Sequence, residues 1–377
     1  MNQQLENASD SGGLSLNICV TRSSASDSSS TMEDFLAFGD TGSYCEKSHV
    51  REFAKYFLPP IYWSVFLLGT TGNLLVIFIY MHYRRIKTMT DAYLLNLAIA
   101  DLLFLATLPF WAISVSHQWI FRTAMCKAVN SIYTINVYSC MLFLACISVD
   151  RYMAIVQATR ALKNKHKQLL CSKVVCISVW LLAMVLSLPE LLYSEEVQGD
   201  EAKVCTMAYP SSFSRHIKII VLSLKLTVGF CVPFLVMFFC YTLIVKTLLQ
   251  ARSFQKHKAL KVIFTIITVF VVSQVPYNSI LMMRTLEAAS VTLRDCKTTV
   301  NLDIATQITQ SLAFLHSSLN PLLYVFVGVQ FRHDLFKILK KFGCMSRSQW
   351  ARYVGSAWSS KRTSEILETK SSGTFTL

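Results

Sequence analysis

The sequence predicts an all-α membrane protein whose seven transmembrane helices form one bundle. A helix needs about 20 apolar residues to cross the hydrocarbon core of a bilayer, and seven stretches of this chain meet that length. Short blocks of alternating apolar and polar residues, which indicate a transmembrane β-barrel, are missing. The loops are short, so the 377 residues leave no room for a second soluble domain. The predicted spans are Phe57–Met81, Ala92–Val115, Ala128–Val156, Cys171–Leu192, Ile217–Val245, Ala259–Met283 and Ile304–Val327.

The distribution of charge sets the topology. The formal net charge of +14 is concentrated in alternate loops and after the last span, which argues against a nucleic-acid-binding function. Basic loops stay in the cytoplasm, so seven spans place the N-terminus outside and the C-terminus inside. The basic residues are Arg84, Arg85 and Lys87, then Arg160, Lys163, Lys165 and Lys167, then Lys246, Arg252, Lys256, Lys258 and Lys261, and finally Arg332, Lys337, Lys340 and Lys341.

The chain divides into four segments on this topology. Residues 1–56 form an extracellular tail, which has no apolar region typical of a signal peptide. Residues 1–50 of this tail are rich in serine, glycine and aspartate, so we expect them to be disordered until bound. Residues 57–328 form the helix bundle, residues 329–342 a short amphipathic helix parallel to the membrane, and residues 343–377 a cytoplasmic tail. Asn7-Ala8-Ser9 is a glycosylation sequence on the outer side.

Each span carries polar residues or prolines that are costly in a bilayer. Asp101, Asn73 and Asn320 lie inside different spans and could form one polar cluster, either as a structural network or as part of a switch. Prolines remove a backbone hydrogen bond and kink or loosen helices. In chain order these residues are Asn73; Asp101 and Pro109; Asp150 and Arg151; Pro189; Pro233; Pro276; and Asn320 with Pro321.

Five of the twelve cysteines fall on the outer side. Cys126 opens the third span and Cys205 lies in the long second outer loop, so a bond between them would hold this loop over the mouth of the bundle. Cys45 precedes the first span and Cys296 lies between the sixth and seventh, which are neighbours if the bundle closes into a ring. Sequence alone does not fix the connectivity, and Cys19 is left over.

The outer face is acidic, whereas enzyme signatures are absent. Acidic residues in the tail and the second outer loop are consistent with ordinary solvation or with electrostatic steering of a basic ligand. No phosphate-binding glycine loop, metalloprotease motif or nucleophile elbow occurs, and the histidines do not have metal-ligand spacing. We expect neither catalysis nor a metal or other cofactor. A channel or transporter is a weaker alternative, because no span carries the several charges that would line an ion path.

The order and spacing of several short motifs resemble the rhodopsin-like G-protein-coupled receptors and, more closely, the CC chemokine receptors. The general motifs are Gly72-Asn73, Leu97-Ala98-Ile99-Ala100-Asp101, Asp150-Arg151-Tyr152, Trp180, Pro233 and Asn320-Pro321-Leu322-Leu323-Tyr324. The narrower ones are Thr107-Leu108-Pro109, Trp119 and Asp150-Arg151-Tyr152-Met153-Ala154-Ile155-Val156, and the four paired outer cysteines agree with them.

The resemblance implies a two-part contact with a basic chemokine. The tail would hold the body of the chemokine through Asp34, Asp40, Glu46 and Tyr44, the last a candidate for sulfation. The N-terminus of the chemokine would enter a pocket, although aromatic core packing also explains some of its residues. Many relatives carry glutamate where this chain has Gln310, so Glu287 or Asp303 would have to receive the terminal amine. The pocket residues are Tyr62, Trp111, Tyr133, Tyr277, Glu287, Asp303 and Gln310.

The resemblance also implies a plasma-membrane receptor that couples to an inhibitory-type heterotrimeric G protein, releases Ca²⁺ and drives leukocyte migration. The expected partners are a CC chemokine, with the thymus-expressed one favoured, the G protein, arrestin, receptor kinases and membrane lipid. A non-signalling scavenger is the alternative, but such receptors often alter the Asp-Arg-Tyr motif that is intact here. The switch residues are Asp150, Arg151, Tyr152, Tyr241, Asn320, Pro321 and Tyr324.

Overall fold

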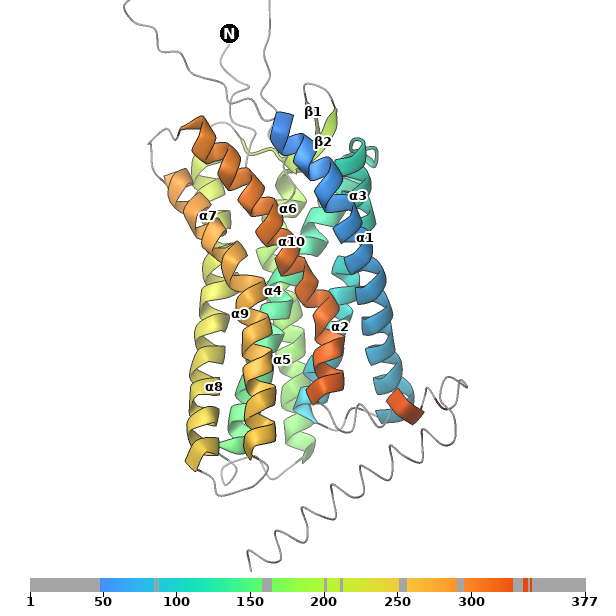
Figure 1. Ribbon diagram of the computed structural model, residues 1–377, viewed down its shortest axis with the longest axis vertical. Coiled ribbons are helices and arrows are strands. Elements are labelled where there is room, and N and C mark those ends of the chain that lie inside the picture. Colours follow the sequence, from blue (N-terminus) through green and yellow to red (C-terminus); the bar gives the residue numbers. More distant parts are fainter. Residues whose placement is uncertain are drawn as a thin grey trace, which may run out of the picture.

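The protein is an elongated bundle of helices in the computed structural model (Figure 1). The structure describes residues 48–84, 86, 88–157, 165–199, 202–210, 213–250, 256–289, 295–327, 335–337 and 340. Within them, five helical stretches are apolar and long enough to cross a bilayer, and α9 and α10 supply the sixth and seventh predicted spans. The helices are α1 (Ser48–Ile79), α2 (Met89–Leu105), α3 (Leu108–Ser116), α4 (Arg122–Ile155), α5 (Lys165–Leu186), α6 (Leu188–Tyr193), α7 (Ser214–Leu226), α8 (Val232–Gln250), α9 (Lys256–Ala289) and α10 (Cys296–Val327), with π-helical turns at η1 (Tyr80–Arg84) and η2 (Thr227–Cys231).

The first helix begins at Ser48, before the predicted span. Val50, Ala54 and Leu58 follow one another at helical spacing and are all buried, so this outer turn packs into the core instead of belonging to the tail. Further along α1, Gly72 allows α10 to approach closely. A Cβ on Gly72 would lie 2.9 Å from the Cγ of Pro321.

Two predicted spans are broken where prolines begin a new helix. The second span consists of α2 and α3, which meet at Ala106 and Thr107 just before Pro109. The fourth consists of α5 and α6, separated at Ser187 before Pro189. In both cases proline occupies the first turn of the new helix, where its missing N–H costs no hydrogen bond.

The other helix prolines are accommodated differently. The π-helical turn η2 ends two residues before Pro233 and joins α7 to α8. Pro276 and Pro321 lie inside α9 and α10, which run through them as single helices. The seventh helix begins at Cys296, eight residues before the start predicted at Ile304.

The second outer loop contains a feature that the all-helical prediction missed. Strands β1 (Ser194–Gln198) and β2 (Lys203–Met207) form an antiparallel hairpin, with Glu196 opposite Cys205. Neither strand shows the strict alternation of apolar and polar residues that predicts a strand from sequence. The hairpin lies at the same end of the bundle as α3 and the start of α1 (Figure 1).

Aromatic and aliphatic side chains fill the outer half of the bundle. The largest buried cluster of the described residues joins α1, α2, α3, α4 and α10. Phe314 packs between its aromatic rings, with its centroid 4.9 Å from that of Phe104 and 5.7 Å from that of Tyr133. Deeper in the bundle, Trp180 of α5 donates a 2.9 Å hydrogen bond to Asn96 of α2.

The segment after the seventh helix is described only in part. Residues 335–337 are helical, and Leu335 packs against the buried cluster around Val76, Ile79 and Tyr80. A contact of this kind is expected of an amphipathic helix that turns back along the bundle. The remainder of the predicted 329–342 helix lies outside the described residues.

Candidate functional site

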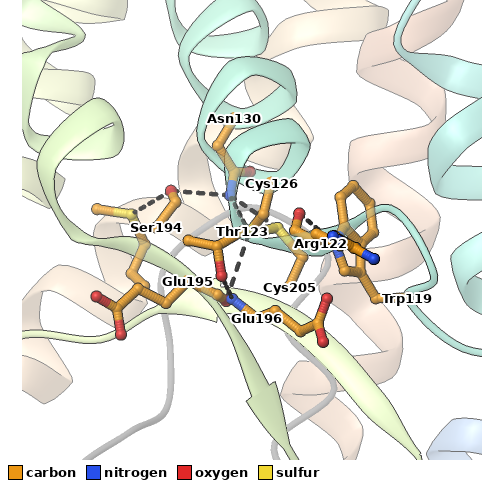
Figure 2. The surroundings of a disulfide bond; sticks show 10 residues. Trp119, Arg122, Thr123, Cys126, Asn130, Ser194, Glu195, Glu196 and Cys205 are labelled. Atoms are coloured by element: carbon orange, nitrogen blue, oxygen red, sulfur yellow. Dashed lines mark hydrogen bonds between the residues drawn. A yellow bond between two sulfur atoms is a disulfide. The ribbon is translucent and has the colours of Figure 1, made fainter.

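A disulfide fixes the second outer loop to the third transmembrane helix. Cys126, in the second turn of α4, is bonded to Cys205 of β2 (Figure 2). Two further contacts orient the hairpin: the Asn130 amide donates to the Ser194 hydroxyl at 3.0 Å, and the Glu196 amide donates to the Thr123 hydroxyl at 3.3 Å. The hairpin is therefore held over the mouth of the bundle by covalent and polar bonds together.

The second proposed disulfide is only half described. Cys296, at the start of α10, is disulfide-bonded. Its proposed partner, Cys45, lies outside the described residues, as do the proposed tail contacts Asp34, Asp40, Tyr44 and Glu46 and the glycosylation residue Asn7.

The structure brings three of the proposed pocket residues together below this hairpin. The hydroxyls of Tyr133 and Tyr277 lie 3.4 Å apart, and the Gln310 amide donates to the Tyr133 hydroxyl at 3.5 Å. Tyr62 and Trp111 are instead buried in the aromatic cluster, where the Trp111 ring lies 5.8 Å from that of Trp119. Core packing, which the sequence left as an alternative, therefore accounts for the positions of Tyr62 and Trp111.

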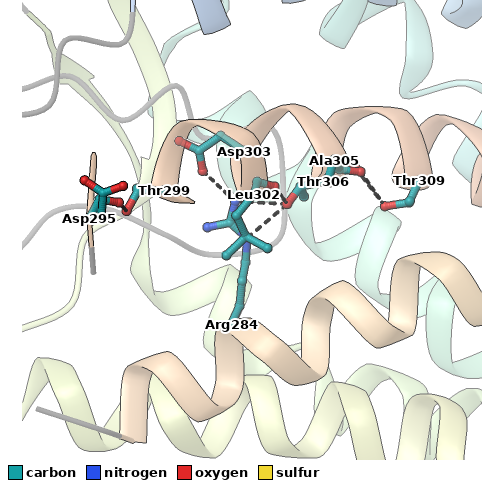
Figure 3. A network of polar contacts seen from close by, with 8 residues as sticks. All are labelled: Arg284, Asp295, Thr299, Leu302, Asp303, Ala305, Thr306 and Thr309. Atoms are coloured by element: carbon teal, nitrogen blue, oxygen red, sulfur yellow. Dashed lines mark hydrogen bonds and ion pairs between the residues drawn. The ribbon is translucent and has the colours of Figure 1, made fainter. Parts of the chain in front are cut away.

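Asp303, one proposed acceptor of a ligand amine, already has a cationic partner. Arg284 of α9 reaches across to α10 and contacts the Asp303 carboxylate at 2.5 Å and the Thr306 hydroxyl at 2.9 Å (Figure 3). Arg284 was not predicted from the sequence as a site residue; it meets Asp303 near the outer ends of the neighbouring helices α9 and α10. A ligand amine that binds Asp303 would have to compete with this guanidinium. Glu287, the other proposed acceptor, is partly buried one turn further along α9.

A polar network crosses the middle of the bundle. The fully buried Asp101 accepts hydrogen bonds from Asn320 at 2.8 Å and from Asn136 at 3.4 Å. Asn73 takes part indirectly, because its amide donates to the backbone oxygen of Ser317 at 2.9 Å instead of reaching Asp101. Side chains of α2, α4 and α10 thus meet at Asp101, and α1 joins this network through the bond from Asn73 to Ser317. The contributions of Asn136 and Ser317 were not predicted from the sequence.

Asp101→Asn should preserve the shape of this network while removing its buried charge. Since a charged acceptor makes stronger hydrogen bonds than a neutral one, the relative stability of the bundle's resting and active arrangements should shift. We expect normal surface expression and ligand binding but an altered agonist efficacy, measured by G-protein nucleotide exchange. Unchanged potency and efficacy would restrict Asp101 to a structural role.

The proposed cytoplasmic switch contains a residue that the sequence did not reveal. Arg151 forms an ion pair with Asp150, 3.8 Å away, and it also donates to the Thr90 hydroxyl, which in turn donates to the Asp150 carboxylate. Thr90 therefore links α2 to the end of α4. Tyr241 of α8 lies close to both Ser148 and Arg151.

The remaining switch residues take different positions. Tyr152 accepts a hydrogen bond from the Gln157 side chain at 3.0 Å, so it does not join the Arg151 network directly. Asn320 belongs to the Asp101 network, and Pro321 packs beside Gly72. Tyr324 is in the helical backbone of α10, while its side chain lies outside the described residues.

Comparison with known proteins identifies the family. Residues 72–324 match the 7 transmembrane receptor family, also called the rhodopsin family. The chain is 54% identical to the C-C chemokine receptor type 9 of Homo sapiens over 92% of this chain and 94% of that protein, and 53% identical to the Mus musculus receptor over the same shares. It is also 42% identical to the Homo sapiens C-C chemokine receptor type 7, over 95% of this chain and 94% of that receptor. The chain therefore belongs to the chemokine receptors of the rhodopsin family and is a multi-pass protein of the plasma membrane.

Proposed function

We propose that this protein is a signalling receptor for a CC chemokine and couples to an inhibitory-type heterotrimeric G protein. The observation that carries the proposal is the 54% sequence identity between this chain and a C-C chemokine receptor, which extends over nearly the whole of both chains. Ligand binding would then release Ca²⁺ in leukocytes and direct their migration. The thymus-expressed CC chemokine is the ligand that the type 9 resemblance favours.

The arrangement of the outer end supports a two-part mode of binding. The acidic tail would contact the body of a basic chemokine, and the N-terminus of the chemokine would enter beside the hairpin towards Tyr133, Tyr277 and Gln310. The Cys126–Cys205 bond keeps the hairpin above this entrance. A ligand amine would displace Arg284 from Asp303 or bind nearer Glu287.

The inner end supports signalling over scavenging. Asp150 and Arg151 are both present, and both contact Thr90 of α2, so the Asp-Arg-Tyr motif that scavengers often alter is intact and held in a polar network. Receptor kinases and arrestin would act on the serine- and threonine-containing cytoplasmic tail, and membrane lipid would surround the bundle.

We expect one chemokine in a panel, the thymus-expressed CC chemokine, to release Ca²⁺ from cells that express this chain. Pertussis toxin, which uncouples inhibitory-type G proteins, should abolish the response. Uptake of the chemokine without Ca²⁺ release would support a scavenger instead. Ion or solute flux through purified protein in liposomes, with no chemokine binding, would support a channel or transporter.

A further inference from the structure

A buried ion pair joins the fourth and fifth transmembrane spans. The Lys225 ammonium of α7 lies 2.8 Å from the Glu190 carboxylate of α6, and the two side chains are 6% and 3% exposed. Charges so deep in a membrane protein are costly and usually functional. Each residue lies next to a helix irregularity: Glu190 directly follows Pro189 in the first turn of α6, and Lys225 is two residues before η2.

Several polar groups at and near this ion pair have unused hydrogen-bonding capacity. Lysine has three donors, and Glu190 is the single partner that the structure gives Lys225 among the described residues. The Glu190 oxygens lie close to the ammonium but form no well-directed hydrogen bond there. The buried Tyr209 hydroxyl also has no hydrogen-bond partner in the described part of the chain. Burial and the nearby Glu190 carboxylate raise the pKa of Tyr209, so this hydroxyl stays a donor.

Lys225 also lines a cavity. The cavity has a volume of about 60 Å³ and is lined by Lys225, Tyr133 and Tyr277 together with polar side chains such as Asn136 and Gln274. Glu190 does not line it, nor does any other aspartate or glutamate of the described residues. The volume accommodates a few water molecules or one small polar group. The lining therefore combines a lysine and several amide side chains with apolar residues such as Phe104 and Met141, and it includes no carboxylate among the described residues.

We propose that Lys225 is a specificity-determining residue that binds a carboxylate from the N-terminal segment of the ligand. The inference rests on the proposed chemokine receptor function. Glu190 holds the Lys225 ammonium in place through the ion pair. The N–H groups of Lys225 that do not face Glu190 donate to an acceptor that enters the cavity. A hydrogen bond to a charged group is shorter and stronger than a neutral one, and exclusion of water strengthens it further. A ligand amine, in contrast, is repelled from this cavity and stays higher, near Asp303 and Glu287.

The proposal is tested with a scan of the thymus-expressed chemokine, in which each N-terminal position carries glutamate in one form and glutamine in the other. At one position the wild-type receptor should prefer the glutamate form by on the order of tenfold in affinity. The double variant E190Q/K225Q removes both charges and leaves neither one buried alone, so it should lose this preference. The matched control E196Q/K203Q removes the exposed ion pair of the hairpin, 2.8 Å long, and should keep it.

A charge-swapped receptor, E190K/K225E, provides the second test because it keeps the ion pair but places the carboxylate at the cavity wall. It should prefer a lysine form of the ligand at the same position. An E190Q/K225Q receptor with the wild-type glutamate preference, or a swapped receptor with unchanged preference, would overturn the role of Lys225. The wild-type receptor binding no chemokine at all would instead reject the proposed function.

Discussion

Replacement of Cys126 and Cys205 by serine is expected to remove most correctly folded, ligand-binding receptor from the cell surface. The bond closes a loop across 79 residues of sequence. On the chain-entropy model, a loop of that length is worth about 4.5 kcal/mol of stability. This is an upper limit here, because the unfolded state of a membrane protein retains helices and is already restricted. It is still a large share of the roughly 5–15 kcal/mol that stabilises a typical folded protein.

The hairpin should be affected most in the double serine variant. Its remaining contacts with α4, chiefly Asn130 to Ser194 and Thr123 to Glu196, are individual hydrogen bonds. Each is worth only about 1 kcal/mol net. The hairpin should therefore leave its position over the mouth, and affinity for the chemokine should fall in the receptors that still reach the surface.

Surface labelling, thermal inactivation of ligand binding and peptide mapping without reduction would check this expectation. Cys171→Ser is the matched control, since Cys171 is a free and exposed cysteine. It should leave all three measurements unchanged. Normal expression and affinity in the double serine variant would mean that hairpin hydrogen bonds alone position the second outer loop.

The positions of the spans could be predicted because the bilayer imposes one strong requirement, a long apolar helix. The position of a proline did not predict the local helix structure around it. Pro109 and Pro189 start new helices, Pro233 follows a π-helical turn, and Pro276 and Pro321 lie within unbroken ones. The same residue type gives different outcomes because neighbouring helices decide how the freed backbone groups are satisfied.

The contacts among the site residues were predictable only in part, because they too depend on which helices pack together. Asp101 and Asn320 stand out in sequence because charged and amide groups are rare in a bilayer. Thr90 and Ser317 do not stand out, because hydroxyl groups are common in helices, and Arg284 falls one residue beyond the predicted sixth span. Their roles depend on which helices face one another. The hairpin was missed because its strands lack a strict alternation of apolar and polar residues and its position depends on a bond between Cys126 and Cys205 that sequence alone could not assign.

Arg151→Ala should abolish agonist-driven nucleotide exchange on the G protein while sparing chemokine binding. Arg151 lies at the inner end of α4, far along the helix from Tyr133 and the pocket, so its loss should not disturb the ligand contacts. Its guanidinium is bound to Asp150 and Thr90, and Tyr241 lies within its electrostatic range. We expect activation to release it from this network as α9 swings outward about Pro276, so that it contacts the C-terminal helix of the G protein.

The Thr90→Val variant distinguishes a signalling role of Arg151 from one in which Arg151 only anchors the end of α4 at the membrane surface. Valine keeps the shape of threonine but can neither accept from Arg151 nor donate to Asp150, so the resting network is weakened while the arginine remains. We expect raised basal exchange in Thr90→Val and background exchange in Arg151→Ala, both compared at matched surface expression. If Arg151 only anchored the helix end, its long side chain would reach the interface for solvation alone. The Arg151→Ala receptor would then stimulate nucleotide exchange on the G protein at the wild-type rate. Thr90→Val would leave the basal exchange rate unchanged.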